Sequence, residues 1–284
     1  MKPKFIYRSV DLFSFLGIDE KPEPSDFKYH THLMCEIYYF VEGDAIFHVE
    51  GAQYPLKPGD ILVMRPTEAH YVEVRSNHFY ERFVINFSPD LLYSIDPETR
   101  LLDPFLKREA GTTNLYRNDD PDNSPYLPYI KAFQDSHGDR MTMIANLILL
   151  LNQINSTYTA VVRNSSKPTT LEAKVLAWID TNLPRAVTLD ELCTRYGISR
   201  SQLLRRFKKA TGTTIGKYIS AKRLILAQQL IKEGNNPTEI YTSCGFQDYS
   251  SFYRSYLKYF GYSPKMEQYQ PKIQSEDNHK YFID

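Results

Sequence analysis

The chain has 284 residues, 42% of them hydrophobic, and its 34 Lys plus Arg balance 34 Asp plus Glu, so the formal net charge is zero. This length predicts about two domains with ordinary cores. The three cysteines, Cys35, Cys193 and Cys244, are scattered, which excludes a disulfide framework and favours a reducing compartment. Because the sequence has no apolar run of about 18 residues and no apolar core near its N-terminus, we expect neither a membrane span nor a signal peptide, and a cytoplasmic protein.

The region from Lys28 to Phe87 has the pattern of a β domain. Short runs rich in Tyr, Phe, Val and Ile are separated by turn residues such as Gly43, Gly51 and Gly59, which predicts antiparallel strands. Many short strands at regular spacing favour a barrel or jelly roll, whose mouth can hold a small ligand.

Polar side chains gather in this region. Residues of one parity in a continuous strand project from one face, and a further histidine follows on a later strand. We predict that these residues bind an effector: His30, His32, Glu36, Tyr38 and His70. The many tyrosines nearby combine an apolar ring with a hydroxyl, which suits sugars, so carbohydrate is a candidate effector class.

The spacing His30-x-His32-x3-Glu36, followed by His70, resembles the motifs of the cupin superfamily, although the second motif departs from the pattern. The resemblance implies a cupin-like barrel with these four residues as metal candidates, and such ligands suit zinc, iron or nickel. We favour a pocket that hydrogen-bonds an organic ligand, with no metal or cofactor. A third alternative is that the histidines only satisfy backbone groups.

Helices are predicted after Phe87. Apolar residues at helical spacing occur from Asp139 to Tyr158. We expect this helix to pack on the barrel and on a helix near Tyr126 to Gln134, with self-pairing as the alternative. A polar stretch from Thr112 to Ser124 predicts a loop. Residues 164–170 are predicted to be a linker, with Thr169 capping the next helix.

The C-terminal part contains a diverged repeat. Arg205, Phe207 and Gly212 recur as Arg254, Tyr256 and Gly261, so one supersecondary unit is used twice. Each unit has a glycine in its turn, Gly197 in the first and Gly245 in the second. Each also has its own helix-capping residues, Thr188 and Ser199 in the first unit and Asn236 and Asp248 in the second. This pattern predicts a helix, a tight turn and a helix in each unit.

The second helix of each unit buries an i, i+4 pair and exposes the chemistry of major-groove recognition. The residues predicted to contact DNA are Arg200, Ser201, Leu204, Arg205, Lys208, Tyr249, Ser250, Arg254 and Lys258. A long helix from Ile215 to Lys232 joins the units and would span roughly 27 Å, against roughly 34 Å between successive major-groove faces. The alternative is a pair of solvated charged faces.

Charge supports a nucleic-acid partner. Residues 171–270 contain 15 Lys plus Arg and 8 Asp plus Glu, a net charge of +7, so the remainder carries −7. A basic domain therefore stands beside an acidic one, and local positive charge attracts phosphate.

These residues resemble the AraC/XylS family of transcription regulators over roughly Leu171 to Gln268. The strongest matches are Arg223, Leu224, Ala227, Leu230, Glu239, Ile240, Gly245, Phe246, Ser251, Phe252, Arg254, Lys258, Gly261, Ser263 and Pro264. The resemblance implies base contacts by residues of both recognition helices and dimerisation through helices of the sensor domain. The chain departs from the family at Cys193 and Tyr241, where small alanines are usual, and at Glu267 and Gln268, where Tyr-Arg is usual.

We therefore predict an α+β protein: a cupin-like sensor and dimerisation domain (1–163), a linker (164–170), a tandem helix-turn-helix domain (171–270) and a polar, disordered tail (271–284). Its function would be effector-controlled, sequence-specific binding of double-stranded DNA, as a homodimer, with RNA polymerase as a partner if it activates. The first alternative is a metal-dependent cupin enzyme using His30, His32, Glu36 and His70. The second is a constitutive DNA-binding protein without a ligand response.

Overall fold

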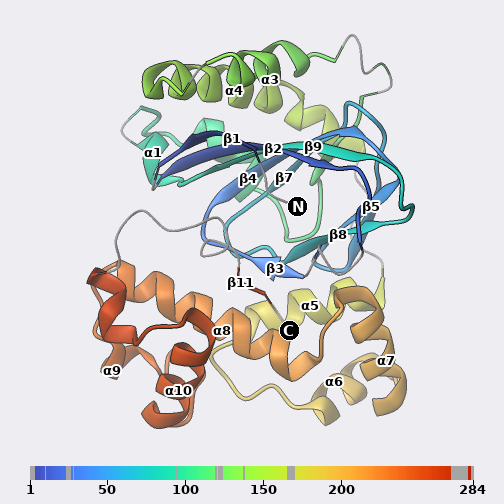
Figure 1. Cartoon of the computed structure of the whole chain (residues 1–284). Coiled ribbons are helices and arrows are strands. Elements are labelled where there is room, and N and C mark those ends of the chain that lie inside the picture. The colour runs from blue at the N-terminus through green and yellow to red at the C-terminus, as the bar shows by residue number, and fades with distance from the viewer. Residues whose placement is uncertain are drawn as a thin grey trace. The chain divides into compact units, whose positions relative to one another are not determined.

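The computed structural model describes residues 4–9, 11–23, 27, 29–93, 95–118, 120, 124–136, 138–164, 170–269 and 281–282. The chain divides into two compact units. The first consists of Met1–Phe27, Met34–Val49 and Gln53–Lys167, and the second of Lys28–Leu33, Glu50–Ala52 and Pro168–Asp284. Strands dominate the N-terminal part and helices the C-terminal part (Figure 1), so the predicted α+β class is confirmed.

Among the described residues, the strands form two sheets, of six and five strands, with the orders β1-β2-β9-β4-β7-β10 and β11-β3-β8-β5-β6. Their bounds are β1 Lys4–Arg8, β2 Leu12–Asp19, β3 His30–Thr31, β4 Cys35–Glu42, β5 Ala45–Val49, β6 Ala52–Pro55, β7 Ile61–Met64, β8 His70–Val74, β9 Tyr80–Phe87, β10 Leu115–Tyr116 and β11 Tyr281–Phe282. The strands predicted between Lys28 and Phe87 are present. Strands β1 and β2 were not predicted. They pair antiparallel with each other, and β2 also pairs with β9.

Alternating side chains of the six-stranded sheet build two cores. On its inner face, Phe13, Tyr38 and Val84 pack with Phe47 and Val72 of the other sheet. On its outer face, residues such as Ile37 and Ile85 pack against helices. Both faces are therefore apolar, which explains why β4 and β9 are buried along almost their whole length.

Helices α3 and α4 cover the outer face of the six-stranded sheet (Figure 1). The helical elements of this unit are α1 Asp90–Tyr93, η2 Arg100–Leu102, α2 Asp103–Leu106, α3 Leu127–Gln134 and α4 Arg140–Asn164. Leu147, Leu151 and Ile154 of α4 are fully buried in that core, so core packing accounts for most of the predicted apolar stripe. Met141 is the exception, because its side chain is 73% exposed.

The second unit is helical from Leu171 onward. Its elements are α5 Leu171–Thr181, α6 Leu189–Tyr196, α7 Arg200–Thr211, α8 Ile215–Lys232, α9 Pro237–Ile240, α10 Tyr249–Phe260 and η4 Pro264–Tyr269. The long joining helix has the bounds that the sequence predicted. Thr170, not Thr169, caps α5, because its side chain accepts a hydrogen bond from the Ala173 amide.

Two further expectations change. The predicted loop from Thr112 to Ser124 contains β10, which pairs with β7. The predicted tail contains β11, which pairs with β3, so the expectation of disorder is wrong for Tyr281–Phe282, and residues 271–280 lie outside the described part. Among the described residues, every helix is too short or too polar to cross a membrane.

Candidate functional site

The first helix-turn-helix unit consists of α6, a turn at Gly197, and α7. The Thr188 side chain caps α6, and α7 has a full capping box in which Ser199 and Gln202 satisfy each other's backbone amides. Gly197 has a φ of 60° and ends α6, a conformation that costs glycine little. The capping by Thr188 and Ser199 predicted for these helices is thus present.

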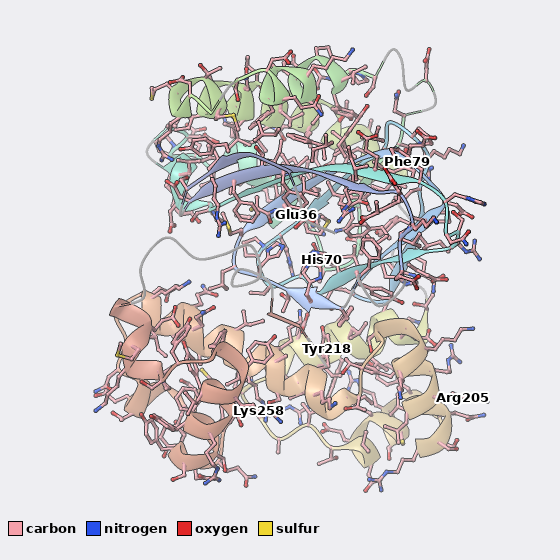
Figure 2. The ribbon with its side chains drawn as sticks, in the orientation of Figure 1. Glu36, His70, Phe79, Arg205, Tyr218 and Lys258 are labelled. Atoms are coloured by element: carbon pink, nitrogen blue, oxygen red, sulfur yellow. The ribbon has the colours of Figure 1, made fainter. Side chains whose placement is uncertain are left out.

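Helix α7 has one buried and one exposed face. Leu203 and Phe207, four residues apart, are 2% exposed. The five residues predicted to contact DNA from this helix are all exposed: Arg200, Ser201, Leu204, Arg205 and Lys208. Figure 2 shows Arg205 pointing outward from α7. By contrast, Arg206 is directed to α5, where its Nε donates to Glu172 Oε1 at 2.5 Å.

The second helix-turn-helix unit differs from the first in its first helix. Helix α9 has only four residues, with Asn236 as its cap and Pro237 at its first position, and hydrogen-bonded turns lead from it to Gly245. The diverged repeat is present, but the first helix of the second helix-turn-helix unit is reduced. The expected helix shortens to one turn, and Tyr241 lies half-buried at its end instead of inside a tight helix junction.

Helix α10 repeats the arrangement of α7. Asp248 caps it by accepting a hydrogen bond from the Ser251 amide at 2.8 Å. Phe252 and Tyr256 are fully buried. Of the four residues predicted to contact DNA from this helix, Ser250, Arg254 and Lys258 are exposed and Tyr249 is half-buried.

A close contact at Gly245 joins the second helix-turn-helix unit to the segment that precedes the first. A methyl group added there would lie 2.4 Å from the Leu183 carbonyl oxygen and 2.5 Å from Arg223 Nε, and its φ is 91°. Arg223, on α8, donates to the Leu183 carbonyl at 2.9 Å and to the Arg185 carbonyl at 2.7 Å. Only glycine fits this position. Gly245 and Arg223 therefore fix the turn before α10 against α8 and against the segment that follows α5.

The departure at Glu267 has a structural role. This residue is 5% exposed and accepts hydrogen bonds from the Tyr256 hydroxyl at 2.5 Å and from Gln228 Nε2 at 3.3 Å. Lys232 Nζ lies 3.6 Å away. The carboxylate of Glu267, a departure from the Tyr usual in the family, therefore anchors α10 to α8.

The barrel brings its predicted polar residues together. One ligand atom from each of His30, His32, Glu36 and His70 lies within 4.8 Å of all the others, and the side chains of Glu36 and His70 are inside the barrel (Figure 2). The predicted continuous strand is wrong, because β3 belongs to the five-stranded sheet and β4 to the six-stranded sheet. The packing of the two sheets, rather than parity along one strand, unites these residues.

The contacts of His70 define its orientation. Its Nδ1 lies 2.8 Å from the Glu68 carbonyl oxygen, and because a carbonyl can only accept, Nδ1 is the donor of this hydrogen bond. Nε2 is 3.8 Å from Glu36 Oε1. The imidazole stacks on Phe47 with ring centroids 5.7 Å apart.

Two further residues belong to the same interior: Asn86, which was not predicted, and Tyr80, one of the tyrosines expected to line the pocket. Asn86 is 1% exposed and stands opposite Glu36 in the β4–β9 pairing. Its Nδ2 has no hydrogen-bond partner among the described residues. Tyr80 forms a short hydrogen bond with Tyr38 between their hydroxyls. Burial raises the pKa of Tyr38 well above its usual range and that of Tyr80 to about 12, so both stay neutral at physiological pH.

The signal for Asn86 was the period-2 alternation of Tyr80, Arg82, Val84 and Asn86 in β9. The interior is therefore polar at one end, near Glu36 and Asn86, and aromatic around Tyr38 and Tyr80.

Comparison with known families agrees with both parts. Residues 12–118 match the family model described as the AraC-like ligand binding domain, and residues 192–268 match a helix-turn-helix domain. The chain belongs to the AraC family of transcription regulators. It is thus a transcription regulator with a ligand-binding domain and a helix-turn-helix domain.

Several curated relatives of this regulator are similar over nearly their whole length. The transcriptional activator RhaS of Escherichia fergusonii is 25% identical over 273 residues, which cover 90% of this chain and 94% of RhaS. The activator RhaR of Shigella dysenteriae is 25% identical, covering 85% and 87%. Among solved structures, ToxT of Vibrio cholerae has 12% identity and a TM-score of 0.38, covering 91% of this chain and 98% of ToxT.

Proposed function

We propose that this AraC-family regulator binds double-stranded DNA sequence-specifically through α7 and α10. The observation that carries the proposal is the equivalence of Arg205 and Arg254, each exposed in the second turn of a capped helix with a buried i, i+4 pair. A guanidinium can donate two hydrogen bonds to one guanine. Lys208 and Lys258, one turn later, would contact phosphate.

Salt dependence tests this proposal. The slope of log K against log salt is negative, and each phosphate contact adds about one to its magnitude. We expect Lys208→Ala and Lys258→Ala to weaken binding to all duplexes and each to reduce the magnitude of the slope by about one, in fluorescence anisotropy with labelled DNA. Arg206→Ala is the matched control on the same helix, because Arg206 pairs with Glu172. Unchanged slopes in both lysine variants would contradict the proposal.

We further propose that the interior residues His30, His32, Glu36, Tyr38 and His70 bind a small-molecule effector, with carbohydrate as the favoured class. Imidazole nitrogens, a carboxylate and neutral tyrosine hydroxyls offer both donors and acceptors, and buried rings such as Phe47 can cover the apolar face of a sugar. Effector binding would shift the balance between conformations that differ in DNA affinity.

A panel of monosaccharides tests the effector class, with DNA affinity measured with and without each sugar. We expect one sugar to change the affinity, and Glu36→Gln to abolish that response while leaving sugar-free DNA affinity intact. Glu42→Gln is the control, because Glu42 is exposed at the end of the same strand. A response that survives Glu36→Gln would remove this site from the proposal, and no response to any sugar would remove the carbohydrate class.

The same four ligand groups also favour a second candidate, a divalent metal centre. Three imidazoles and a carboxylate within 4.8 Å fit the ligands that zinc or iron prefers. A bound metal could supply Lewis-acid chemistry, as in the alternative of a cupin enzyme. Stoichiometric metal in the purified protein, with a turnover lost on chelation, would favour the enzyme. A DNA-binding protein with neither metal nor turnover would support the regulator alone.

The remaining parts of the proposal concern organisation. We propose the domain limits 1–163, 164–170, 171–270 and 271–284, homodimerisation through α4, and contact with RNA polymerase if the protein activates. Met141, Leu149 and Val162 of α4 are exposed apolar residues, which supports a dimer contact on this helix. The cytoplasm is the proposed location because the proposed partner is genomic DNA.

A further inference from the structure

Three tyrosines form an aromatic row in the second helix-turn-helix unit. The rings of Tyr241 and Tyr249 meet edge to face with centroids 5.9 Å apart, and those of Tyr249 and Tyr253 lie 6.2 Å apart. Tyr249 also packs on the fully buried Phe252 at 5.8 Å. The row therefore starts at the end of α9, packs on the core through Tyr249, and ends at Tyr253, a residue that is 36% exposed.

The first unit has no such row. Since Arg205 and Arg254 are 49 residues apart, Tyr249 corresponds to Arg200 and Tyr253 to Leu204, whereas Ser201 and Ser250 are the same. The two recognition helices thus share a serine and an arginine and differ at the neighbouring positions. Those positions in α10 carry rings instead of a cation and an aliphatic chain.

Aromatic rings at these positions suit one feature of DNA. In the major groove, only thymine presents a methyl group, and apolar side chains contact it. Tyr253 follows Ser250 by three residues and precedes Arg254 by one, so its ring borders the face proposed to contact bases. The ring of Tyr249 packs on those of Tyr241, Phe252 and Tyr253. A ring held in this way loses little conformational entropy on contact, which favours a defined site over a loose apolar patch.

We propose that Tyr249 and Tyr253 contact thymine methyl groups and so select A·T pairs in the half-site bound by α10, with Tyr241 as the residue that positions Tyr249. This inference rests on the proposed function, since it needs α10 in the major groove. It also explains Tyr241, the departure from the small residue usual in this family, as a support for the recognition surface.

Replacing thymine by deoxyuridine removes only the methyl group. On a duplex obtained by selection, we expect one or two such replacements in the α10 half-site to weaken wild-type binding about fourfold each, equivalent to about 0.8 kcal/mol for one buried methyl. In Tyr253→Ala, replacing the thymine that faces Tyr253 in the wild-type complex should not weaken binding further. In Leu204→Ala, on α7, the same replacement should weaken binding as much as in the wild type. Tyr253→Phe should also keep it, because the ring and not the hydroxyl makes the contact.

Tyr241 has its own test. Tyr241→Ala should lose the sensitivity to deoxyuridine in the α10 half-site, and Tyr241→Phe should restore it, with circular dichroism confirming that both variants are folded. If the protein binds the selected DNA but is indifferent to every thymine replacement in that half, the inference is wrong and the proposed function stands. If Tyr253→Phe binds as weakly as Tyr253→Ala, the hydroxyl contacts a phosphate or base and the methyl contact is wrong. Absence of sequence-selective binding overturns both.

Discussion

A buried ion pair in the barrel leads to a quantitative prediction about acid stability. Glu68 and Arg108 are both buried, and the guanidinium donates to both carboxylate oxygens at 2.7 and 2.6 Å. The Glu68 carboxylate also accepts from the Gly111 amide at 2.7 Å and from Asn114 Nδ2 at 3.1 Å. Both carboxylate oxygens of Glu68 therefore accept hydrogen bonds when the group is ionised, and protonation of the carboxylate would break this network.

The size of the effect follows from the pKa. Burial alone would raise the pKa of Glu68, but the charge of Arg108 and the hydrogen bonds outweigh burial and lower the pKa from 4.5 to about 2. This difference corresponds to about 3 kcal/mol of folding stability. Because the folded pKa is the lower one, the contribution is complete above pH about 5 and is lost as the pH falls from about 4.5 toward 2. About 2 kcal/mol should be lost between pH 5 and pH 3.

Urea unfolding followed by circular dichroism between pH 5 and pH 3 measures this loss. In Glu68→Gln the residue cannot titrate, so the difference in unfolding free energy between wild type and variant should shrink by about 2 kcal/mol over this range. Glu98→Gln removes an exposed carboxylate paired with Arg100, and its difference should stay within about 1 kcal/mol throughout. A Glu68→Gln difference that does not change with pH would refute the reasoning.

Three further predictions concern the helical unit and α4. Gly245→Ala should destabilise the protein by more than about 2 kcal/mol in thermal unfolding. The control Gly234→Ala, at a similar φ of 94° but with no atom within 4 Å of the added methyl group, should cost about 1 kcal/mol. Equal losses in the two variants would show that the contact with Leu183 is unimportant. Ser199→Ala should cost about 1 kcal/mol by removing the cap of α7, and Ser199→Asp should restore it; an unchanged melting temperature in the alanine variant would contradict the capping assignment. Met141→Glu should leave the melting temperature unchanged and yield monomers in light scattering, and a dimer that persists would argue against a dimer contact at this end of α4.

Much of the helical unit could be predicted because its signals are local. A capping residue, a glycine with positive φ and an i, i+4 apolar pair are each readable within one turn. Ser199, Gly197, Leu203 and Phe207 therefore have the structural roles predicted for them. The joining helix was also predicted, since Ile215 to Lys232 lies between a threonine cap and a glycine-containing turn.

The barrel was less predictable because its site depends on contacts distant in sequence. His30 and Glu36 were placed together by parity along a strand that does not exist, and they meet because two sheets pack together. Asn86 joins them through pairing of β9 with β4, which the sequence alone does not specify. Likewise, the sequence marked Glu267 only as a departure from the family pattern, whereas its hydrogen bond from the Tyr256 hydroxyl depends on how α10 packs on α8.

Selection from a random pool of duplex DNA tests the central claim most directly. Wild-type protein should enrich a two-part site whose halves are centred about one helical turn apart. Selection with Arg205→Ala should relax the sequence of one half, and selection with Arg254→Ala should relax the other. Failure to enrich any sequence, together with binding that does not depend on salt, would contradict the account and direct attention to the histidine cluster of the barrel.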